Sequence, residues 1–439
     1  MPRSSATPEA GDEPDRSAGA GGPQGTDPGF SDDTVQQGKP ESLGERLLGS
    51  LIDRAHVMPP RLLAPLLAQE IVAVGGRDVS VYLQDYDQAW LRPLPGEGLT
   101  DTDPLPVEGS WAGRAFSSDT AVEQPQDDGG TRLFLPMLDG SDRVGVLAFT
   151  LPQVDDDDRR LARRLAGLAA DMIVTKGAYT DAFFRARASR PMSLPAQLQW
   201  QLLPPLTMTT PRVAVAGILE PAYDVGGDSF DYALDDHVLG LAIIDAMGHG
   251  LDAATMATVA IAAYRHARRA GVSLVDLYAE MDSAVAAQFP GRFATAQMGE
   301  LDVSTGELTW VNAGHPAPLL LRGRRVVAEL TGATTRPVGF GGATPLVQTR
   351  QLEPGDRVLF YTDGVVEERL SGGEQFGEDR LIDLLERAGA EGINTPETIR
   401  RLSRALMSGR AGKTSDDATL LLVEWTGPGG DEELFRVAT

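Results

Sequence analysis

The chain has 439 residues, of which 42% are hydrophobic and none is cysteine, and its formal net charge is −24. The absence of cysteine excludes disulfides, zinc–thiolate sites and thiol nucleophiles, and the acidic balance argues against a nucleic-acid partner, because phosphate backbones are bound by Lys and Arg. There is neither an apolar run long enough for a membrane span nor the apolar region of a signal peptide, so we expect a cytoplasmic protein without membrane contact.

Residues 1–41 are dominated by Gly, Pro, Ser, Asp and Glu, with almost no aliphatic side chains. Such a segment cannot bury enough surface to offset the entropy of ordering, so it is predicted to be a disordered tail. A first folded unit is predicted over 42–175, with helices over 43–56 and 62–72 and a last helix after the carboxylate run 155–158, which suits the positive helix end. Short strands are expected between these helices, at 79–83, 89–91, 132–138 and 144–150. This order is typical of an α+β sensor unit.

Residues 176–204 are predicted to form a helical linker, interrupted near Pro191 and Pro195. The segment carries more apolar surface than a passive linker needs. Two interpretations remain open: the linker packs on a neighbouring domain, or it forms a homodimer through a signalling helix. The apolar residues in question are Phe183, Phe184, Leu194, Leu198, Trp200 and Leu203.

A second unit is predicted over 205–426, followed by a C-terminal tail over 427–439. Its pattern indicates an α/β sandwich of mostly antiparallel strands with flanking helices. The expected elements are a strand pair at 213–219 and 229–233, a strand at 238–245, helices at 251–269 and 273–287, strands at 293–303, 307–312, 317–321, 326–329 and 357–361, helices at 377–388 and 395–406, and a strand at 418–425.

Four short acidic islands lie in this second unit: 225–232, 244–250, 361–364 and 415–423. In three of them a carboxylate stands at the end of a predicted strand, and glycines beside it allow a backbone carbonyl or a phosphate to approach closely. Carboxylate and carbonyl oxygens suit hard divalent cations, so the pattern indicates Mg²⁺ or Mn²⁺. The islands come from both ends of the unit, and their convergence in space would make a site.

Six motifs in chain order carry a family likeness, and they cover nearly all of 200–425. They resemble the bacterial SpoIIE/RsbU-type PP2C-like (PPM) serine phosphatases, whose fold implies two antiparallel sheets flanked by helices. The first unit is similar to a GAF sensor domain, in Ser110–Phe116 and in the strands between Leu133 and Thr150. The six motifs are Leu202–Pro205, Glu220–Asp228, Asp245–Gly250, Asn312–Pro316, Tyr361–Gly364 with Glu367, and Ser415–Thr419.

The resemblance implies a centre of two Mn²⁺ or Mg²⁺ ions. Asp245 would bridge both ions, and the Ala246 carbonyl would bind one of them. Asp363 and Asp416 would complete the second ion, and Asp228 would be a ligand, directly or through water. Two such ions can activate a shared water for attack on a phosphoryl group.

Some residues near these motifs have competing interpretations. Asp417 competes with Asp416 for the metal, whereas His249 and His315 are expected to hydrogen-bond the backbone of Gly-rich turns rather than to act as general acids. The run 409–414 resembles a Walker A loop, but it has two residues between its glycines where that loop has four, so we expect no nucleotide site there.

The resemblance further implies the activity and its control. The expected substrate is a phosphoserine on a protein, specifically an anti-sigma-factor antagonist, and the first unit would regulate the reaction. Haem or a linked chromophore is not expected in the first unit, because it lacks Cys and its single His is His56, whereas a small ligand and no ligand both remain open. The alternative is a catalytically silent scaffold of the same fold that binds a regulatory partner. The carboxylates Asp245, Asp363 and Asp416 argue against the scaffold, which has no need of converging buried charges.

Overall fold

The computed structural model describes residues 43–55, 57–140, 142–224, 226–409 and 417–429. The predicted N-terminal tail, Asp416, most of the Walker-like run and most of the C-terminal tail lie outside these residues. The described residues from Leu43 onward belong to one unit.

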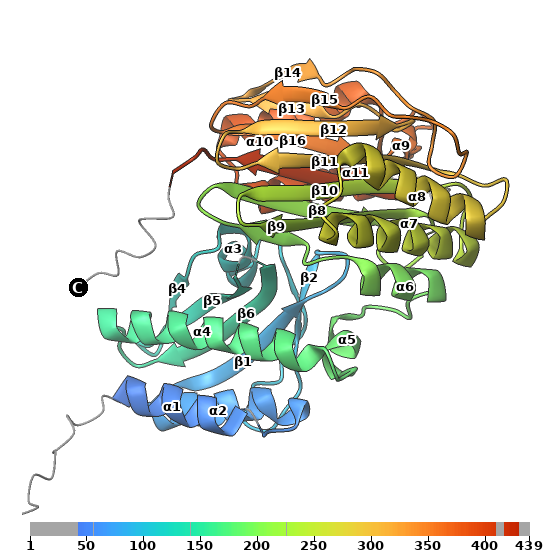
Figure 1. Ribbon diagram of the computed structural model, residues 1–439. Coiled ribbons are helices and arrows are strands. Elements are labelled where there is room, and N and C mark those ends of the chain that lie inside the picture. Colours follow the sequence, from blue (N-terminus) through green and yellow to red (C-terminus); the bar gives the residue numbers. More distant parts are fainter. Residues whose placement is uncertain (1–42, 56, 141, 225, 410–416, 430–439) are drawn as a thin grey trace, which may run out of the picture. The chain divides into compact units, whose positions relative to one another are not determined.

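The first part of this unit is a six-stranded antiparallel sheet with the strand order β3-β2-β1-β6-β5-β4 (Figure 1). Helix α4 packs on β5 and β6, and its apolar face joins α1 and α2 in one core. Asp155 and Asp158 cap the start of α4 through a reciprocal pair of side-chain to backbone hydrogen bonds, so the carboxylate run is a helix start, as predicted. The elements are α1 Leu43–Ala55, α2 Leu63–Ala73, β1 Arg77–Gln84, β2 Trp90–Pro93, β3 Leu105–Pro106, α3 Trp111–Ser118, β4 Val122–Pro125, β5 Thr131–Asp139, β6 Asp142–Leu151 and α4 Asp156–Gly177.

Two short helices, α5 Ala182–Arg187 and α6 Leu194–Leu202, connect this sheet to the rest of the chain. The linker helix is interrupted between Arg187 and Leu194, close to Pro191 and Pro195, as predicted. Pro195 stands in the first turn of α6, where its missing N–H has no helical partner to lose, and the Ser193 hydroxyl caps that turn by accepting from the Ala196 N–H.

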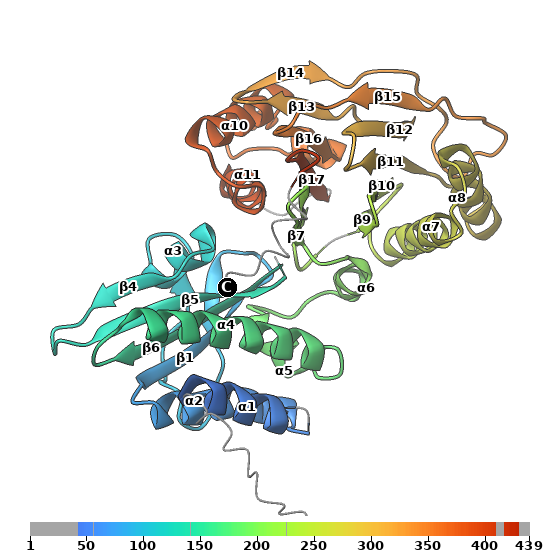
Figure 2. The same ribbon diagram turned by 60° about the vertical axis from the view of Figure 1, so that its left-hand side comes forward.

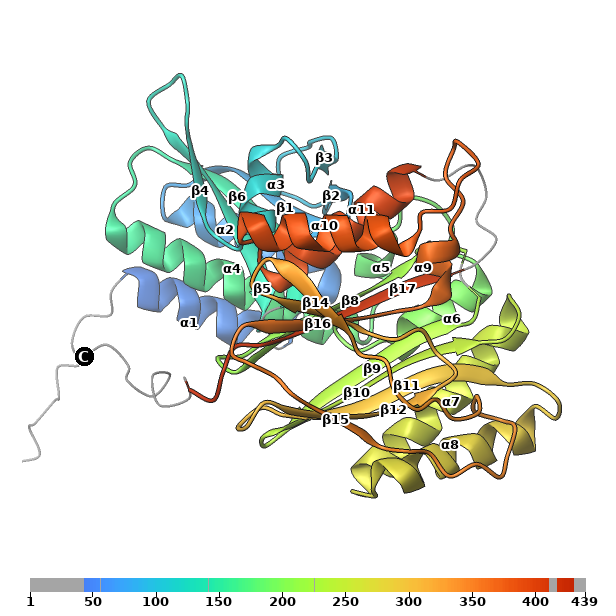
Figure 3. The ribbon, with the colours of Figure 1, turned by 90° about the horizontal axis from the view of Figure 1, so that it is seen from above.

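The second part contains two antiparallel sheets, with the strand orders β15-β12-β11-β10-β9 and β14-β13-β16-β17-β8-β7. The sheets pack face to face, and α7 and α8 cover the outer face of the first while α10 and α11 cover that of the second (Figures 2 and 3). This arrangement confirms the predicted antiparallel sheets with flanking helices. The elements are β7 Thr207–Thr209, β8 Val213–Glu220, β9 Asp228–Asp235, β10 Val238–Ala246, α7 Leu251–Arg269, α8 Leu274–Gln288, β11 Ala294–Asp302, β12 Glu307–Ala313, β13 Leu319–Arg322, β14 Arg325–Glu329, β15 Gln348–Gln351, β16 Asp356–Tyr361, α9 Asp363–Glu367, α10 Glu378–Glu391, α11 Thr395–Gly409 and β17 Ala418–Trp425.

Strands β8 and β9 were expected to pair with each other, and this prediction is wrong. Strand β8 pairs with β7 and β17, whereas β9 pairs with β10 in the other sheet. The two strands meet face to face instead, because Gly217 leaves room for the Phe230 ring: a Cβ on Gly217 would lie 2.4 Å from Phe230 Cζ. The connection between β8 and β9 therefore crosses from one sheet to the other, and this crossing matters for the site.

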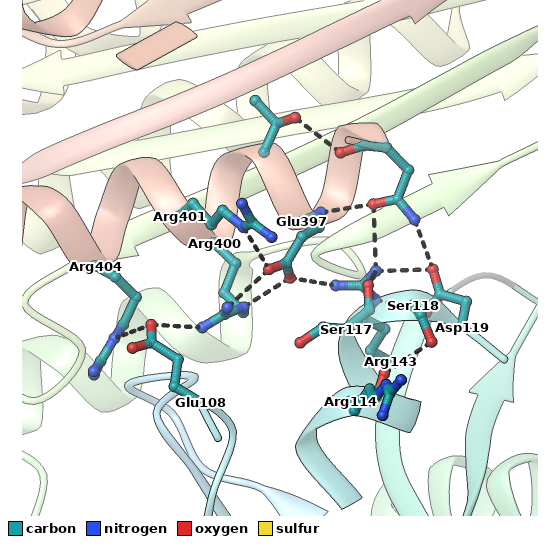
Figure 4. Close-up of polar contacts among 12 residues, drawn as sticks. Glu108, Arg114, Ser117, Ser118, Asp119, Arg143, Glu397, Arg400, Arg401 and Arg404 are labelled. Carbon is teal, nitrogen blue, oxygen red and sulfur yellow. Dashed lines mark hydrogen bonds and ion pairs between the residues drawn. The ribbon is translucent and has the colours of Figure 1, made fainter. Parts of the chain in front are cut away.

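Helix α11 also meets the first part of the unit through polar contacts (Figure 4). Arg143, at the start of β6, donates to both carboxylate oxygens of Asp119 at 2.8 Å and lies 3.4 Å from Glu397 Oε2. Glu397 in turn binds Arg400 through two bonds of 2.8 Å. Arg143, Glu397 and Arg400 are all buried.

None of the helices in the described part of the chain is both long and apolar enough to cross a membrane.

Candidate metal centre

Two acidic islands meet through the register of neighbouring strands. Asp228 is the first residue of β9, and it stands opposite Asp245, the second-last residue of β10. Directly opposed residues of antiparallel strands project to the same side of the sheet. Asp228 is buried and Asp245 is partly exposed, so the pair forms a carboxylate site that opens toward solvent on one side.

The third island reaches this pair from the other sheet. Thr362 follows the end of β16, and its Oγ1 donates to Asp228 Oδ2 at 2.6 Å. The same hydroxyl accepts from the Thr419 N–H at 2.9 Å, and the Thr362 N–H donates to the Thr419 carbonyl at 3.1 Å. Asp363 comes next and is the first residue of α9, partly exposed. Thr362 therefore ties β16 and β17 of one sheet to β9 of the other.

The fourth island contributes a carboxylate that the backbone holds. Asp417 is buried, and its side-chain oxygens accept from the backbone N–H groups of Gly226 at 2.6 and 2.8 Å, Gly227 at 2.5 Å and Asp228 at 3.1 Å. The structure thus brings together the described residues of all four islands. It also gives Asp417 backbone hydrogen-bond partners. Asp416 lies outside the described residues, so its role as a metal ligand stays a prediction.

Two glycines are required by close backbone approaches at this point. A Cβ on Gly227 would lie 2.3 Å from the Ala246 carbonyl oxygen, and a Cβ on Gly364 would lie 1.7 Å from the Asp417 carbonyl oxygen. The Ala246 N–H donates to the Gly227 carbonyl at 3.1 Å. Any side chain at these positions would push apart the segments that carry Asp228, Asp245 and Asp363.

The electrostatics of the site favour a bound cation. Burial raises the pKa of Asp228 well above its ordinary value, and the negative charges of Asp245 and Asp417 raise it further. The hydrogen bond from Thr362 opposes this shift. Burial also raises the pKa of Asp417, against the effect of the backbone N–H groups that bind it. Adjacent buried carboxylates repel one another, and either a proton or a metal ion relieves the repulsion.

The donor set fits Mg²⁺ or Mn²⁺, which prefer carboxylate and carbonyl oxygens. Within the described ranges, no group of three or more His, Cys, Asp or Glu side chains is arranged to hold an ion. The predicted set has two carboxylates paired across strands, Asp228 and Asp245, with Asp363 at the start of α9, which follows β16 of the opposing sheet. Its remaining member, Asp416, is not among the described residues.

The two histidines near the motifs have different surroundings. The backbone of His315 exchanges two hydrogen bonds with the Asn312 side chain, at 2.8 and 2.9 Å, and its Nδ1 lies 2.9 Å from Thr295 Oγ1. Burial lowers the pKa of His315 to about 3, so the ring is neutral at physiological pH. A neutral, buried ring is suited to hold a turn and is a poor proton donor. His249 is exposed in the loop that follows Asp245.

Sequence reasoning missed two residues of this site. Thr362 precedes the Asp-Gly pair, and the one available signal was its place at the end of a predicted strand. Gln199 lies in α6, and its Nε2 donates to the Asp228 carbonyl at 2.6 Å. No motif in the linker pointed to that contact.

Known proteins resemble this chain over a region that includes most of its second part. Residues 235–426 match the family model described as Stage II sporulation protein E (SpoIIE). The chain is 26% identical over 191 residues to phosphoserine phosphatase RsbP of Bacillus subtilis (strain 168), which covers 42% of this chain and 47% of that protein. It is 25% identical over 224 residues to protein IcfG of Synechocystis sp., which covers 44% of this chain and 33% of that protein. The chain thus spans less than half the length of these curated relatives.

Solved structures with related sequences match about half of the chain. The RsbU and RsbW domains of a Mycobacterium tuberculosis protein are 30% identical, with a TM-score of 0.43, over 50% of this chain and 63% of that chain. The SiaA-PP2C domain of Pseudomonas aeruginosa is 23% identical, with a TM-score of 0.45, over 52% of this chain and 94% of that chain.

Proposed function

We propose that this chain, whose residues 235–426 form a SpoIIE-type PP2C-like domain, is a metal-dependent protein serine/threonine phosphatase. The observation that carries the proposal is the position of Asp228. Its buried carboxylate stands opposite Asp245 and accepts a hydrogen bond from Thr362 of the other sheet, and its negative neighbours disfavour its charge unless a cation is present. A scaffold gains nothing from this arrangement, because buried like charges cost folding free energy.

The proposed ligands are Asp228, Asp245, the Ala246 carbonyl, Asp363 and Asp416, around two Mn²⁺ or Mg²⁺ ions. When bound, the ions would lower the pKa of a shared water and offset the charge of the phosphoryl group. The chain's own contribution is to hold these oxygens in place. Thr362 orients Asp228, and Asp417 binds the backbone that precedes it. Gly364 lets α9 begin directly against β17.

The proposed substrate is a phosphoserine on a protein. The support is the likeness of the matched region to a phosphoserine phosphatase, RsbP. By the family resemblance, the protein that carries the phosphoserine would be an anti-sigma-factor antagonist.

The first part of the chain is proposed to be a GAF-like sensor domain that regulates the phosphatase. Its ligand would act by changing how this part contacts the linker and α11. An aromatic cluster supports this proposal: the ring of Tyr86, which follows β1, lies 4.9 Å from that of Trp200 in α6 and 6.2 Å from that of Tyr223, at centroids. Tyr223 lies in the crossing segment that leads to Gly226 and Asp228. Buried contacts with α11 give a second connection (Figure 4). A homodimer through the linker helices stays a prediction.

Hydrolysis of a generic aryl phosphate tests the proposal directly. The full-length protein should turn over the substrate with Mn²⁺ and lose activity when a chelator is added. Activity that is insensitive to the chelator would contradict a metal-dependent mechanism. No activity with Mn²⁺ on either the aryl phosphate or a phosphoserine protein would favour the silent scaffold.

A further inference from the structure

A cavity of about 340 Å³ lies where one end of the first sheet meets the linker. Its wall is formed by the end of β1, the start of β6, the C-terminal part of α4, helix α5 and residues 203–206. Most of the lining side chains are apolar, among them Phe183, Phe184 and Trp200. Ligand sites in proteins have volumes of about 300–1,000 Å³. This cavity therefore has room for a small molecule with an apolar body.

Two arginines line this apolar cavity, and one of them has donors to spare. Arg143 is already bound to the two carboxylates described above. Arg187 Nε donates to the Gln84 carbonyl at 2.9 Å, and the guanidinium carbon of Arg187 lies 4.5 Å from the centre of the Tyr86 ring. These contacts hold the guanidinium in place, whereas its Nη1 and Nη2 make no hydrogen bond within the part of the chain that the structure describes. A guanidinium held in this way can bind a carboxylate through two parallel N–H bonds.

Among the described residues that line the cavity, Asp142 at the start of β6 supplies the carboxylate. It accepts a hydrogen bond from Thr207 Oγ1 at 3.3 Å. Burial raises the pKa of Asp142, and the positive charge of Arg187 opposes that shift, so the two groups sense each other. Their side chains nevertheless form no direct ion pair in the described structure. A purely structural pair would bring the two charges into contact, because contact is what offsets the cost of removing them from water.

We propose that the cavity is a binding site for a free apolar amino acid: Arg187 binds its α-carboxylate, Asp142 binds its ammonium group, and the aromatic side chains of α5 enclose its apolar body. Such a zwitterion pairs with both lining charges at once. An apolar acid would leave Asp142 without a partner, and an apolar amine would do the same to Arg187. The inference concerns binding alone and does not rest on the proposed function, because none of the described metal ligands lines the cavity.

Calorimetry on the full-length wild-type protein tests each part of the ligand separately. The probe is phenylalanine, with leucine as a second apolar amino acid. Of the analogues, 3-phenylpropionate lacks the ammonium group, phenethylamine lacks the carboxylate and glycine lacks the apolar body. Phenylalanine or leucine should bind with a Kd of about 1 mM or lower, and each analogue should bind about tenfold more weakly or worse. This series needs no variant, so it decides the question even if a substitution prevents folding.

Substitutions then locate the site. Arg187→Met and Asp142→Asn should each raise the Kd for phenylalanine about tenfold or more, since one buried charge of the ligand loses its partner. Arg185→Met and Asp181→Asn are the matched controls, because these two residues form an exposed ion pair on the same helix, and both should keep the wild-type Kd. Saturating phenylalanine should also slow amide hydrogen exchange in 142–144 and 183–187 about threefold or more in the wild type.

Equal affinity for phenylalanine, 3-phenylpropionate and phenethylamine would overturn the inference, as would wild-type affinity in both Arg187→Met and Asp142→Asn. If neither phenylalanine nor leucine binds at about 10 mM, the cavity is not an amino-acid site. These readouts are binding and exchange, so a protein that hydrolyses no phosphate overturns the proposed function and leaves this test unchanged.

Discussion

The hydroxyl of Thr362 lies 2.6 Å from the carboxylate of Asp228, although 134 positions separate the two residues in sequence. This bond joins the sheet that contains β16 to the sheet that contains β9. It also lowers the pKa of Asp228 against the combined effects of burial and of two negative neighbours. One threonine thereby affects both the geometry and the charge state of the candidate centre.

Replacing Thr362 with valine should therefore impair both activity and stability. Without the hydroxyl, the pKa of Asp228 rises further, so the acidic limb of the pH–rate profile should move to higher pH. We expect a loss of about tenfold in kcat at neutral pH and a loss of about 1–3 kcal/mol in unfolding free energy, because the Thr419 N–H also loses its acceptor. Thr362→Ser keeps the hydroxyl and should restore the profile. An unshifted profile in the valine variant would show that this bond does not tune Asp228.

Removing one charge from the proposed ligand set should abolish activity while the fold survives. Asp245→Asn and Asp363→Asn should each lower kcat by about 10²-fold or more, since a few kcal/mol of charge stabilisation are lost. Asp235→Asn, at the exposed far end of β9, is the matched control. Turnover of Asp245→Asn above about a tenth of the wild-type rate would contradict the assignment of Asp245.

The stability of the metal-free protein should depend on pH through Asp228. Its folded-state pKa lies well above the unfolded value of about 3.8, so the folded state holds the proton more tightly. The resulting stabilisation is present below pH 3.8 and is lost as pH rises through the folded-state pKa. In chelator, wild-type thermal stability should therefore fall between acidic and neutral pH by more than that of Asp228→Asn, and Mn²⁺ should restore it in the wild type. Parallel curves for the two proteins would show that the charge of Asp228 carries no such cost.

Because Gly364 lies so close to the start of β17, a side chain at position 364 should clash with the backbone there. Gly364→Ala would place a Cβ 1.7 Å from the Asp417 carbonyl oxygen, so α9 and the start of β17 must separate. We expect a loss of about 2–4 kcal/mol in unfolding free energy, measured by urea denaturation, with activity lost in the folded fraction. At Gly372 a Cβ would meet nothing within 4 Å, so Gly372→Ala should resemble the wild type. Equal stability of both variants would contradict the close approach.

The polar contacts between β6 and α11 should couple the first part of the chain to the proposed phosphatase domain (Figure 4). A double-mutant cycle of Arg143→Met and Glu397→Gln should give a coupling free energy of about 0.5–3 kcal/mol in stability, as expected for a buried contacting pair. Turnover of the single variants should change about fivefold or more if this contact transmits regulation, which corresponds to about 1 kcal/mol or more.

A surface pair supplies the control for that cycle. Arg387 and Asp383 form an exposed ion pair one turn apart on α10, and Asp383→Asn should change neither stability nor turnover appreciably. If the effects of the Arg143 and Glu397 substitutions on stability are additive and each variant keeps wild-type turnover, the contact does not transmit regulation.

The positions of most helices and strands follow from the local sequence. Helix α7 has the predicted bounds, 251–269, since a glycine with φ of 74° precedes it and basic residues occupy its last turn. Most long helices and strands of both parts lie within a few residues of their predicted ranges, because periodicity and capping act over a few positions. Elements shorter than a clear period, such as β7, β15 and α9, had no such signal.

Packing between the two sheets determines the strand pairing and the contacts of the site, which the local sequence pattern does not encode. The sequence offered β8 and β9 as a pair, but Gly217 and Phe230 place them in different sheets, face to face. The sequence also left Asp416 and Asp417 as competitors. The structure shows that the backbone N–H groups of the crossing segment bind the carboxylate of Asp417, whereas the choice of metal ligand between the two stays a prediction. Such contacts join residues almost 200 positions apart, and their distances depend on how two sheets and a linker helix pack, which no short stretch of sequence determines.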